Sequence, residues 1–585
     1  MPASECLSRY FVVAAALCAA SAARAGRGVP CEPLAQTDAG WVRGLCVPND
    51  PAPYASFRGV PYATQPVGKL RFKELEPVDP WPDVYDAFDE GPICHQTDVV
   101  YGRLMKPRGI SEECIYANIH VPLDALPSRQ NKTIEKENTW RREYVSQKEI
   151  EAGRGLPILV SVHGGGFQGG SGDADLHGPE YLVSKNVIVI TFNYRLNAFG
   201  FLSLNSPEIP GNQGLRDQVT LLRWVQRNAR AFGGDPDNVT IMGQSAGAAS
   251  AHLLTLSKAT KGLFKRAFLM SGTGISGFYS SSPVLAQQLS TMFLTKLGIN
   301  STEPAAEIHE KLIKLPVEKI HDANQIMLDE FGLTTFVPTV ESEFPGVTRI
   351  LDEDPEVLML KGRGKDVPLM IGYTSVECEV FRQRLDQINI TAKLIDNPVL
   401  TVPANIIFTT PPEFLMDIAK RIDRKYYNST DGFNTDGFIK YCTDGLYKYP
   451  ALKLAEERAA LGGAPVFLYE FSYNSETSVI KEALDLNYEG AAHIEDLTYL
   501  FRANSVLEPQ GTFRSDDKDE YIKSWMTTYL TNFMRCSEPV CGRSVWAPVR
   551  AERIQVQEVR VPPTCRDLTT EEFDILQFFD SLRYK

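Results

Sequence analysis

Short, fully apolar runs recur along the chain, each bounded by glycine, proline or charged residues. Runs of this length are typical of strands buried on both faces of a sheet. Segments with helical spacing, such as 215–230 and 248–256, lie between several of the runs. This alternation predicts an α/β fold with a large, mostly parallel central sheet flanked by helices. The apolar runs are Ile158 to Val160, Val187 to Ile190, Val239 to Met242, Ala267 to Met270, Leu369 to Ile371 and Val466 to Tyr469.

The first 25 residues have the features of a secretory signal peptide. Residues 11–20 are apolar, Arg9 precedes them, and Ala23-Arg24-Ala25 fits the small-residue pattern for cleavage after Ala25. An apolar run of about ten residues is too short for a bilayer, which takes about 20. We therefore expect residues 1–25 to be removed and residues 26–585 to form a single secreted domain without a membrane span.

Cysteine usage agrees with export. Of the eleven cysteines, Cys6 and Cys18 belong to the predicted signal peptide, and the odd number that remains implies at least one free thiol in a monomer. Spacing alone does not show which cysteines pair. Five sequons are candidate N-glycosylation sites of a secreted chain, and we expect some of them to be occupied: Asn131, Asn238, Asn300, Asn389 and Asn428.

The charged residues indicate a class of partner to exclude and a surface insertion. The formal net charge is −13, so a polyanion would be repelled, and we expect no nucleic-acid partner. Residues 127–155 are dense in Lys, Arg and Glu and nearly free of aliphatic side chains. We interpret this stretch as a charged surface insertion between two strands.

Ser245 is the candidate nucleophile. It is the serine of a G-x-S-x-G motif, Gly243 to Gly247, which follows an apolar strand pattern and precedes a helical one. A serine on a sharp strand-to-helix turn exposes its hydroxyl above the sheet, and the glycines on either side allow the backbone to turn. The motif alone is moderate evidence, because a chain with this glycine content contains such a pentapeptide by chance in about one case in five.

A glycine tract provides the second feature. His163-Gly164-Gly165-Gly166-Phe167 comes directly after the predicted strand that ends at Val162. Consecutive glycines leave backbone N–H groups free to point into a cavity. Together with the N–H of Ala246, those of Gly165 and Gly166 are candidates to bind the negative oxygen of a tetrahedral acyl intermediate.

A nucleophilic serine needs a base, since its hydroxyl is a weak nucleophile at neutral pH. In this kind of site the chain order is serine, acid, histidine. The chain has only eight histidines, and His493 follows a predicted strand and a loop in the required position. His252 also follows Ser245 but lies only seven residues further along the predicted helix. His309 and His321 have no strong strand before them that offers an acid. We therefore expect His493 to be the base.

The acid should lie between Ser245 and His493, just beyond the end of a strand. Glu377 fits, because the apolar run that ends at Ile371 leads directly into its loop. Glu379 and the acidic run 352–354 are competitors, and spacing alone makes Glu377 only the favourite.

Together these stretches resemble the cholinesterase and carboxylesterase family of α/β-hydrolases, from about Val42 almost to the C-terminus. The resemblance implies the α/β-hydrolase fold, Glu377 as the acid, and a disulfide between Cys94 and Cys114. We also expect Asp496 and Ser271 to lie next to the catalytic residues and to help hold them in position. The implied roles fall on Ser245, Glu377 and His493 as the catalytic triad and on Gly165, Gly166 and Ala246 as the oxyanion hole.

Within the family, the chain resembles the insect juvenile hormone esterases. It shares with them Gln244, where many relatives have glutamate, and the pairs Arg71-Phe72 and Asp217-Gln218, of which Arg71 and Asp217 are expected to be ion-paired scaffold residues. The charged insertion departs from the likeness. The resemblance implies a secreted esterase of the haemolymph that hydrolyses the methyl ester of juvenile hormone, a small apolar substrate, without a metal or organic cofactor.

Three alternatives stay open. A broad-specificity or odorant-degrading carboxylesterase would share every catalytic residue. An acetylcholine hydrolase is disfavoured, because no tryptophan lies between Cys94 and Cys114 to hold a quaternary ammonium group. A non-enzymatic adhesion relative would usually lack a triad member or carry a membrane span. The oligomeric state and the fine specificity do not follow from the sequence.

Overall fold

The structure is a computed structural model that describes residues 31–49, 52–127, 155–427, 432–507, 516–542 and 546–583. The predicted signal peptide, residues 128–154 of the charged insertion, and the sequons at Asn131 and Asn428 lie outside the described residues.

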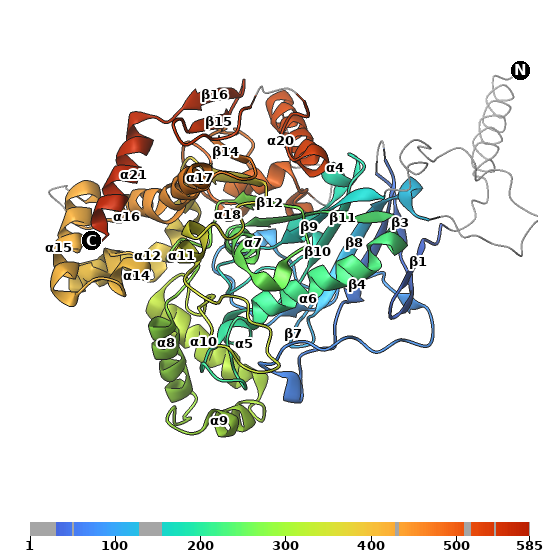
Figure 1. Ribbon diagram of the computed structural model, residues 1–585, viewed down its shortest axis with the longest axis horizontal. Coiled ribbons are helices and arrows are strands. Elements are labelled where there is room, and N and C mark those ends of the chain that lie inside the picture. The colour runs from blue at the N-terminus through green and yellow to red at the C-terminus, as the bar shows by residue number, and fades with distance from the viewer. Residues whose placement is uncertain are drawn as a thin grey trace, which may run out of the picture.

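An eleven-stranded mixed sheet forms the centre of the molecule (Figure 1). Strands from β10 through β15 run parallel, and antiparallel pairs extend the sheet at both ends. Each of the six apolar runs lies in one of the parallel strands, which confirms the predicted α/β-hydrolase architecture. The strands, in spatial order, are β16 (Thr564–Asp567), β15 (Gln555–Val559), β14 (Val466–Phe471), β13 (Leu369–Thr374), β12 (Arg266–Met270), β11 (Gly234–Gln244), β9 (Leu156–Val162), β10 (Ile188–Phe192), β8 (Tyr116–Pro122), β4 (Tyr54–Pro61) and β3 (Leu45–Val47).

Helices cover both faces of this sheet. The two helices predicted from spacing are present as α6 (Gln213–Asn228) and α7 (Ala246–Leu256), which contact each other on one face. On the other face, α20 (Asp517–Cys536) contacts α4 (Glu180–Val183) and strands β9 and β11. Figure 1 shows α20 beside α4. Among the described residues, none of the helices combines the length and the apolar character that a membrane crossing requires.

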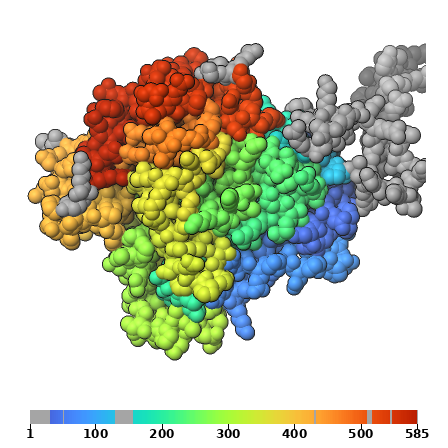
Figure 2. Space-filling model, viewed as in Figure 1, coloured from blue at the N-terminus to red at the C-terminus, as the bar shows by residue number. Residues whose placement is uncertain are grey.

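Two long excursions leave the sheet at the carboxyl ends of β12 and β13 and contain most of the remaining helices. In Figure 2 they form the green, yellow and orange parts of the surface that lie below and beside the C-terminal elements in red. In open α/β sheets, ligands bind outside the carboxyl ends of the strands. The excursions are therefore placed to enclose a site there.

Two ion pairs with little solvent exposure connect loops and helices around the sheet. The Arg71 guanidinium lies 2.5 Å from Glu112, and Arg195 lies 2.6 Å from Asp217. Arg71 also donates to two carbonyl oxygens, those of Leu312 and Leu315, both at 2.8 Å. Arg71 and Asp217 are thus ion-paired scaffold residues, as the sequence predicted.

Four disulfides cross-link the described part of the chain and include the pair Cys94–Cys114 that the family resemblance implied. The others are Cys31–Cys46, Cys378–Cys442 and Cys536–Cys541. Among the described cysteines, Cys565 is free, in agreement with the odd cysteine number, and it is exposed on β16.

Three of the five sequons can be placed. Asn300 and Asn389 are exposed. Asn238 is half-buried, and its side-chain oxygen accepts a hydrogen bond of 2.6 Å from Arg266. Asn300 and Asn389 are therefore the more accessible of the described acceptor sites.

The Cys378–Cys442 disulfide closes a separation of 64 residues, whereas Cys536–Cys541 closes only 5. Because the loss of unfolded-state entropy grows with loop length, we expect Cys378→Ser/Cys442→Ser to lower the free energy of unfolding by about 2 kcal/mol more than Cys536→Ser/Cys541→Ser. Denaturant unfolding of both double variants measures this difference. Equal destabilisation would contradict the expectation.

Candidate active site

Ser245 occupies a sharp turn between β11 and α7. Its backbone has φ 61° and ψ −126°, a region that residues other than glycine rarely adopt. The Ser245 N–H donates to the carbonyl oxygen of Met270 on β12 at 2.8 Å, which holds the turn against the neighbouring strand. The side chain is thereby fixed at the carboxyl end of the sheet, as the G-x-S-x-G motif predicted.

The glycine tract lies directly against this turn. A Cβ atom at Gly164 would be 2.6 Å from the side-chain oxygen of Gln244 and 2.9 Å from Cβ of Ser245, so only glycine fits. Gly165 and Gly166 have positive φ values and line the same cavity as Ser245. Ala246 is the first residue of α7, where backbone N–H groups lack an acceptor within the helix.

His163 anchors the start of the glycine tract. Its ring stacks on Tyr194 with centroids 4.3 Å apart, and the Tyr194 hydroxyl donates to the His163 carbonyl oxygen at 2.9 Å. Burial lowers the pKa of His163 to about 4, so this imidazole is neutral at physiological pH. It serves as a packed support beneath the tract.

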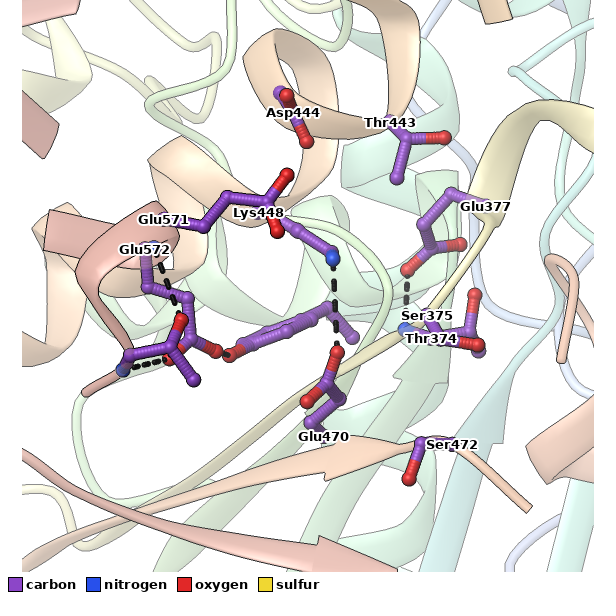
Figure 3. Close-up of polar contacts among 12 residues, drawn as sticks. Thr374, Ser375, Glu377, Thr443, Asp444, Lys448, Glu470, Ser472, Glu571 and Glu572 are labelled. Atoms are coloured by element: carbon purple, nitrogen blue, oxygen red, sulfur yellow. Dashed lines mark hydrogen bonds and ion pairs between the residues drawn. The ribbon is translucent and has the colours of Figure 1, made fainter. Parts of the chain in front are cut away.

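His493 and Glu377 meet in the interior. The Nδ1 atom of His493 lies 2.7 Å from a carboxylate oxygen of Glu377, and both side chains are almost fully buried. The other carboxylate oxygen accepts the backbone N–H of Thr374 at 2.8 Å (Figure 3). The backbone N–H of His493 also donates to the Glu377 carbonyl oxygen at 3.1 Å. The two loops therefore hold each other at the ends of β13 and β14.

The competing acids have other partners. Glu379 pairs with Arg382 at 2.9 Å, and Asp352 pairs with Arg363 at 3.1 Å. Among the competing histidines, His252 accepts the backbone N–H of Gly274 at 3.0 Å. Glu377 and His493 are the acid and the histidine that the structure brings together.

Ser245 and His493 line one cavity, but each has a hydrogen bond that the sequence did not predict. The Ser245 hydroxyl lies 3.0 Å from the hydroxyl of Tyr279. The Nε2 atom of His493 lies 3.0 Å from the side-chain nitrogen of Gln244. In this resting arrangement the serine and the imidazole are not hydrogen-bonded to each other. In many enzymes such hydrogen bonds tighten only when substrate binds.

The sequence analysis identified neither Tyr279 nor Gln244 as a hydrogen-bond partner of the catalytic candidates. It noted Gln244 only as a position where many relatives have glutamate. Tyr279 lies in a loop after β12 and belongs to no motif, so no local signal identifies it.

A narrow cavity, partly open to solvent, lies above Ser245. Its walls are mainly apolar and aromatic, and the polar groups are concentrated at its base around Ser245 and His493. Such a lining suits an apolar molecule with one reactive polar group. The apolar and aromatic lining residues are Val99, Val100, Tyr101, Phe278, Leu333, Phe381 and Ile494.

Asp496 and Ser271, for which the sequence predicted a supporting role, are both buried. The Tyr469 hydroxyl donates to one carboxylate oxygen of Asp496 at 2.8 Å, and the other oxygen has no hydrogen-bond partner among the described residues. Burial, with a smaller contribution from the charge of Glu377, raises the pKa of Asp496 to about 7. Ser271 directly follows β12, and its buried hydroxyl likewise has no described partner.

The fold and the site together define an esterase of the α/β-hydrolase type. The chain belongs to the carboxylesterase family, whose family model matches residues 31–576. It is 54% identical over 554 residues to the juvenile hormone esterase of Heliothis virescens, covering 94% of each chain. It is 32% identical over 504 residues to esterase FE4 of Myzus persicae, covering 84% of this chain and 82% of that protein.

A solved structure agrees with these relatives. The crystal structure of juvenile hormone esterase from Manduca sexta, with OTFP covalently attached, superposes with a TM-score of 0.87 at 53% identity. The match covers 94% of this chain and 99% of that one. The resemblance inferred from the motifs is therefore confirmed at the level of the whole chain.

The carboxyl group of Asp496 makes stability depend on pH. Because its pKa in the folded protein is about 7, well above the value of about 3.9 for an unfolded aspartate, the folded state binds more protons between these values. Its contribution to stability is present below about pH 4 and is lost as pH rises to about 7. We expect the melting temperature of Asp496→Asn, relative to wild type, to rise over this interval.

Thermal unfolding from pH 4 to pH 8 measures this difference. Asp79→Asn, at an exposed position, is the control and should show no such trend. A constant difference between Asp496→Asn and wild type would show that folding does not raise the pKa of Asp496.

Proposed function

We propose that this chain is a secreted serine esterase that hydrolyses the methyl ester of juvenile hormone through an acyl-enzyme intermediate. The observation that carries the proposal is the likeness to juvenile hormone esterases, which continues along nearly the whole chain. The apolar cavity above Ser245 supports a small apolar ester as the substrate.

In the proposed reaction, Ser245 attacks the ester carbonyl carbon while His493 Nε2 takes its proton. Glu377 keeps the imidazole oriented through Nδ1 and stabilises its positive charge. The N–H groups of Gly165, Gly166 and Ala246 receive the negative oxygen of the tetrahedral intermediate. When the intermediate collapses, methanol leaves with the proton from His493.

Water then repeats the sequence on the acyl-enzyme. His493 takes a proton from the water as it attacks the acyl carbon, and returns a proton to Ser245 Oγ when the acid product leaves. Every proton in this cycle passes through one imidazole.

Export is supported by the cross-links. Disulfides persist in oxidising compartments, and the four that the structure contains fit an extracellular protein of the haemolymph. The signal-like segment 1–25 and the accessible sequons at Asn300 and Asn389 support the same location.

Ser245→Ala should remove the nucleophile. We expect kcat to fall by about 10⁶-fold, as in other triad enzymes. Secretion and melting temperature should stay at the wild-type level. The control is Ser250→Ala, which removes another buried hydroxyl on α7 that accepts a hydrogen bond from Gln218. Appreciable turnover by purified Ser245→Ala would exclude the serine mechanism.

A broad-specificity carboxylesterase is the second candidate, because the likeness extends to esterase FE4 of an aphid. The ratio of kcat/KM for juvenile hormone to kcat/KM for a short aryl acetate separates the two. A hormone esterase should favour the hormone by at least about tenfold. A ratio well below one would support the broad-specificity enzyme and overturn the proposed substrate.

A further inference from the structure

The hydroxyl group that contacts the proposed nucleophile comes from a tyrosine. Tyr279 Oη lies 3.0 Å from Ser245 Oγ, and Tyr279 donates to the hydroxyl of Tyr447 at 3.1 Å. The ring of Tyr447 lies against the imidazole of His493, with centroids 4.9 Å apart. Two tyrosines therefore connect the proposed nucleophile to the proposed base by a route separate from the direct proton transfer.

Both tyrosines are fixed in place. Tyr279 is fully buried, and its ring packs edge-on against Phe278 and Tyr447. The hydroxyl of Ser276, in the same loop, donates to the carbonyl oxygen of Leu446 at 3.0 Å. Because Leu446 precedes Tyr447, this bond ties the loop of the first tyrosine to the segment of the second.

Tyr447 lies on an unusual backbone. Residues Thr443–Lys448 form a π-helical turn, a rare conformation that is frequent at functional sites. Lys448 of this turn pairs with Glu470 at 3.5 Å (Figure 3). The Thr443 hydroxyl accepts the backbone N–H of Cys378 at 3.2 Å, beside the disulfide Cys378–Cys442. The turn is thus anchored both to β14 and to the loop of Glu377.

A hydroxyl group can form a hydrogen bond to a neighbouring oxygen both before and after that oxygen becomes negatively charged. Each hydroxyl can donate one hydrogen bond and accept two, so a chain of hydroxyls can reverse its direction. In the resting arrangement Tyr279 donates to Tyr447 and is free to accept from Ser245. Once Ser245 has given up its proton, Tyr279 can donate to Oγ, and Tyr447 can donate to Tyr279.

The tyrosines themselves keep their protons. Burial raises the pKa of Tyr279, and it raises the pKa of Tyr447 well above the ordinary value. Both groups are therefore neutral donors throughout the physiological range.

From this geometry we infer that Tyr279 is a further catalytic residue, whose hydroxyl stabilises Ser245 Oγ while that atom carries negative charge, and that Tyr447 is its positioning residue. The inference rests on the proposed serine mechanism. During acylation the Ser245 proton passes to His493 and the bond from Oγ to the carbonyl carbon forms. During deacylation that bond breaks and His493 returns a proton to Oγ. Tyr279 transfers no proton in either step.

Tyr279→Phe tests the role of the hydroxyl, since it keeps the ring. A hydrogen bond to a charged group is strong enough for its loss to lower kcat/KM by at least about tenfold. We expect KM to change much less than kcat, because the interaction strengthens only after binding. Tyr447→Phe should cause a smaller loss, about twofold to threefold.

Two measurements separate catalysis from structure. Inactivation by a dialkyl fluorophosphate reports directly on the nucleophilicity of Ser245, and Tyr279→Phe should slow it by a factor similar to the loss in kcat/KM. All molecules of the variant should still react with the fluorophosphate, only more slowly. The control is Tyr62→Phe, which removes a buried hydroxyl that donates to the Asn193 carbonyl oxygen at 2.7 Å and lies outside the cavity.

The outcomes are distinct. If Ser245→Ala keeps its turnover, the proposed function fails and the role of Tyr279 fails with it. If Ser245→Ala is inactive but Tyr279→Phe reacts with ester and fluorophosphate at the wild-type rate or faster, only the role of Tyr279 is overturned. If Tyr62→Phe loses as much activity as Tyr279→Phe, the loss reflects a missing buried hydrogen bond and the role is also overturned.

Discussion

A carboxylate can be buried at low cost only where hydrogen-bond donors meet its charge, and Glu377 is completely buried. Its two oxygens accept one bond from the Thr374 backbone and one from His493. The imidazole is thereby held through Nδ1, which leaves Nε2 at the cavity. The position of the carboxylate therefore decides where the loops after β13 and β14 must meet.

The sheet brings the other groups to the same place. Strands β9, β11 and β13 end on one edge, and the glycine tract, Ser245 and Glu377 each follow one of them. Parallel neighbours keep these ends in register. Groups that are far apart in the sequence thus converge because the strands, and not the loops, set their spacing.

The sequence predicted the parts of the site that have local signals. Glycines around Ser245 and the tract at Gly165 are required by tight turns, and the six apolar runs are required by double-sided burial. The identity of the acid needed the family resemblance, because Glu377 and Glu379 have the same local pattern. Tyr279 could not be predicted, since its place depends on how a long excursion folds back over the sheet. The pairing of the cysteines could not be predicted from their spacing either, because spacing carries no information on which loops meet.

The free thiol offers a practical consequence. Cys565 is exposed on the edge strand β16, several strands away from the turn that carries Ser245, and every other cysteine of the described chain is in a disulfide. Among the described cysteines, a maleimide reagent would therefore attach at Cys565 alone. The protein can therefore be labelled with a dye or fixed to a surface in a single orientation while its cavity stays open to solution.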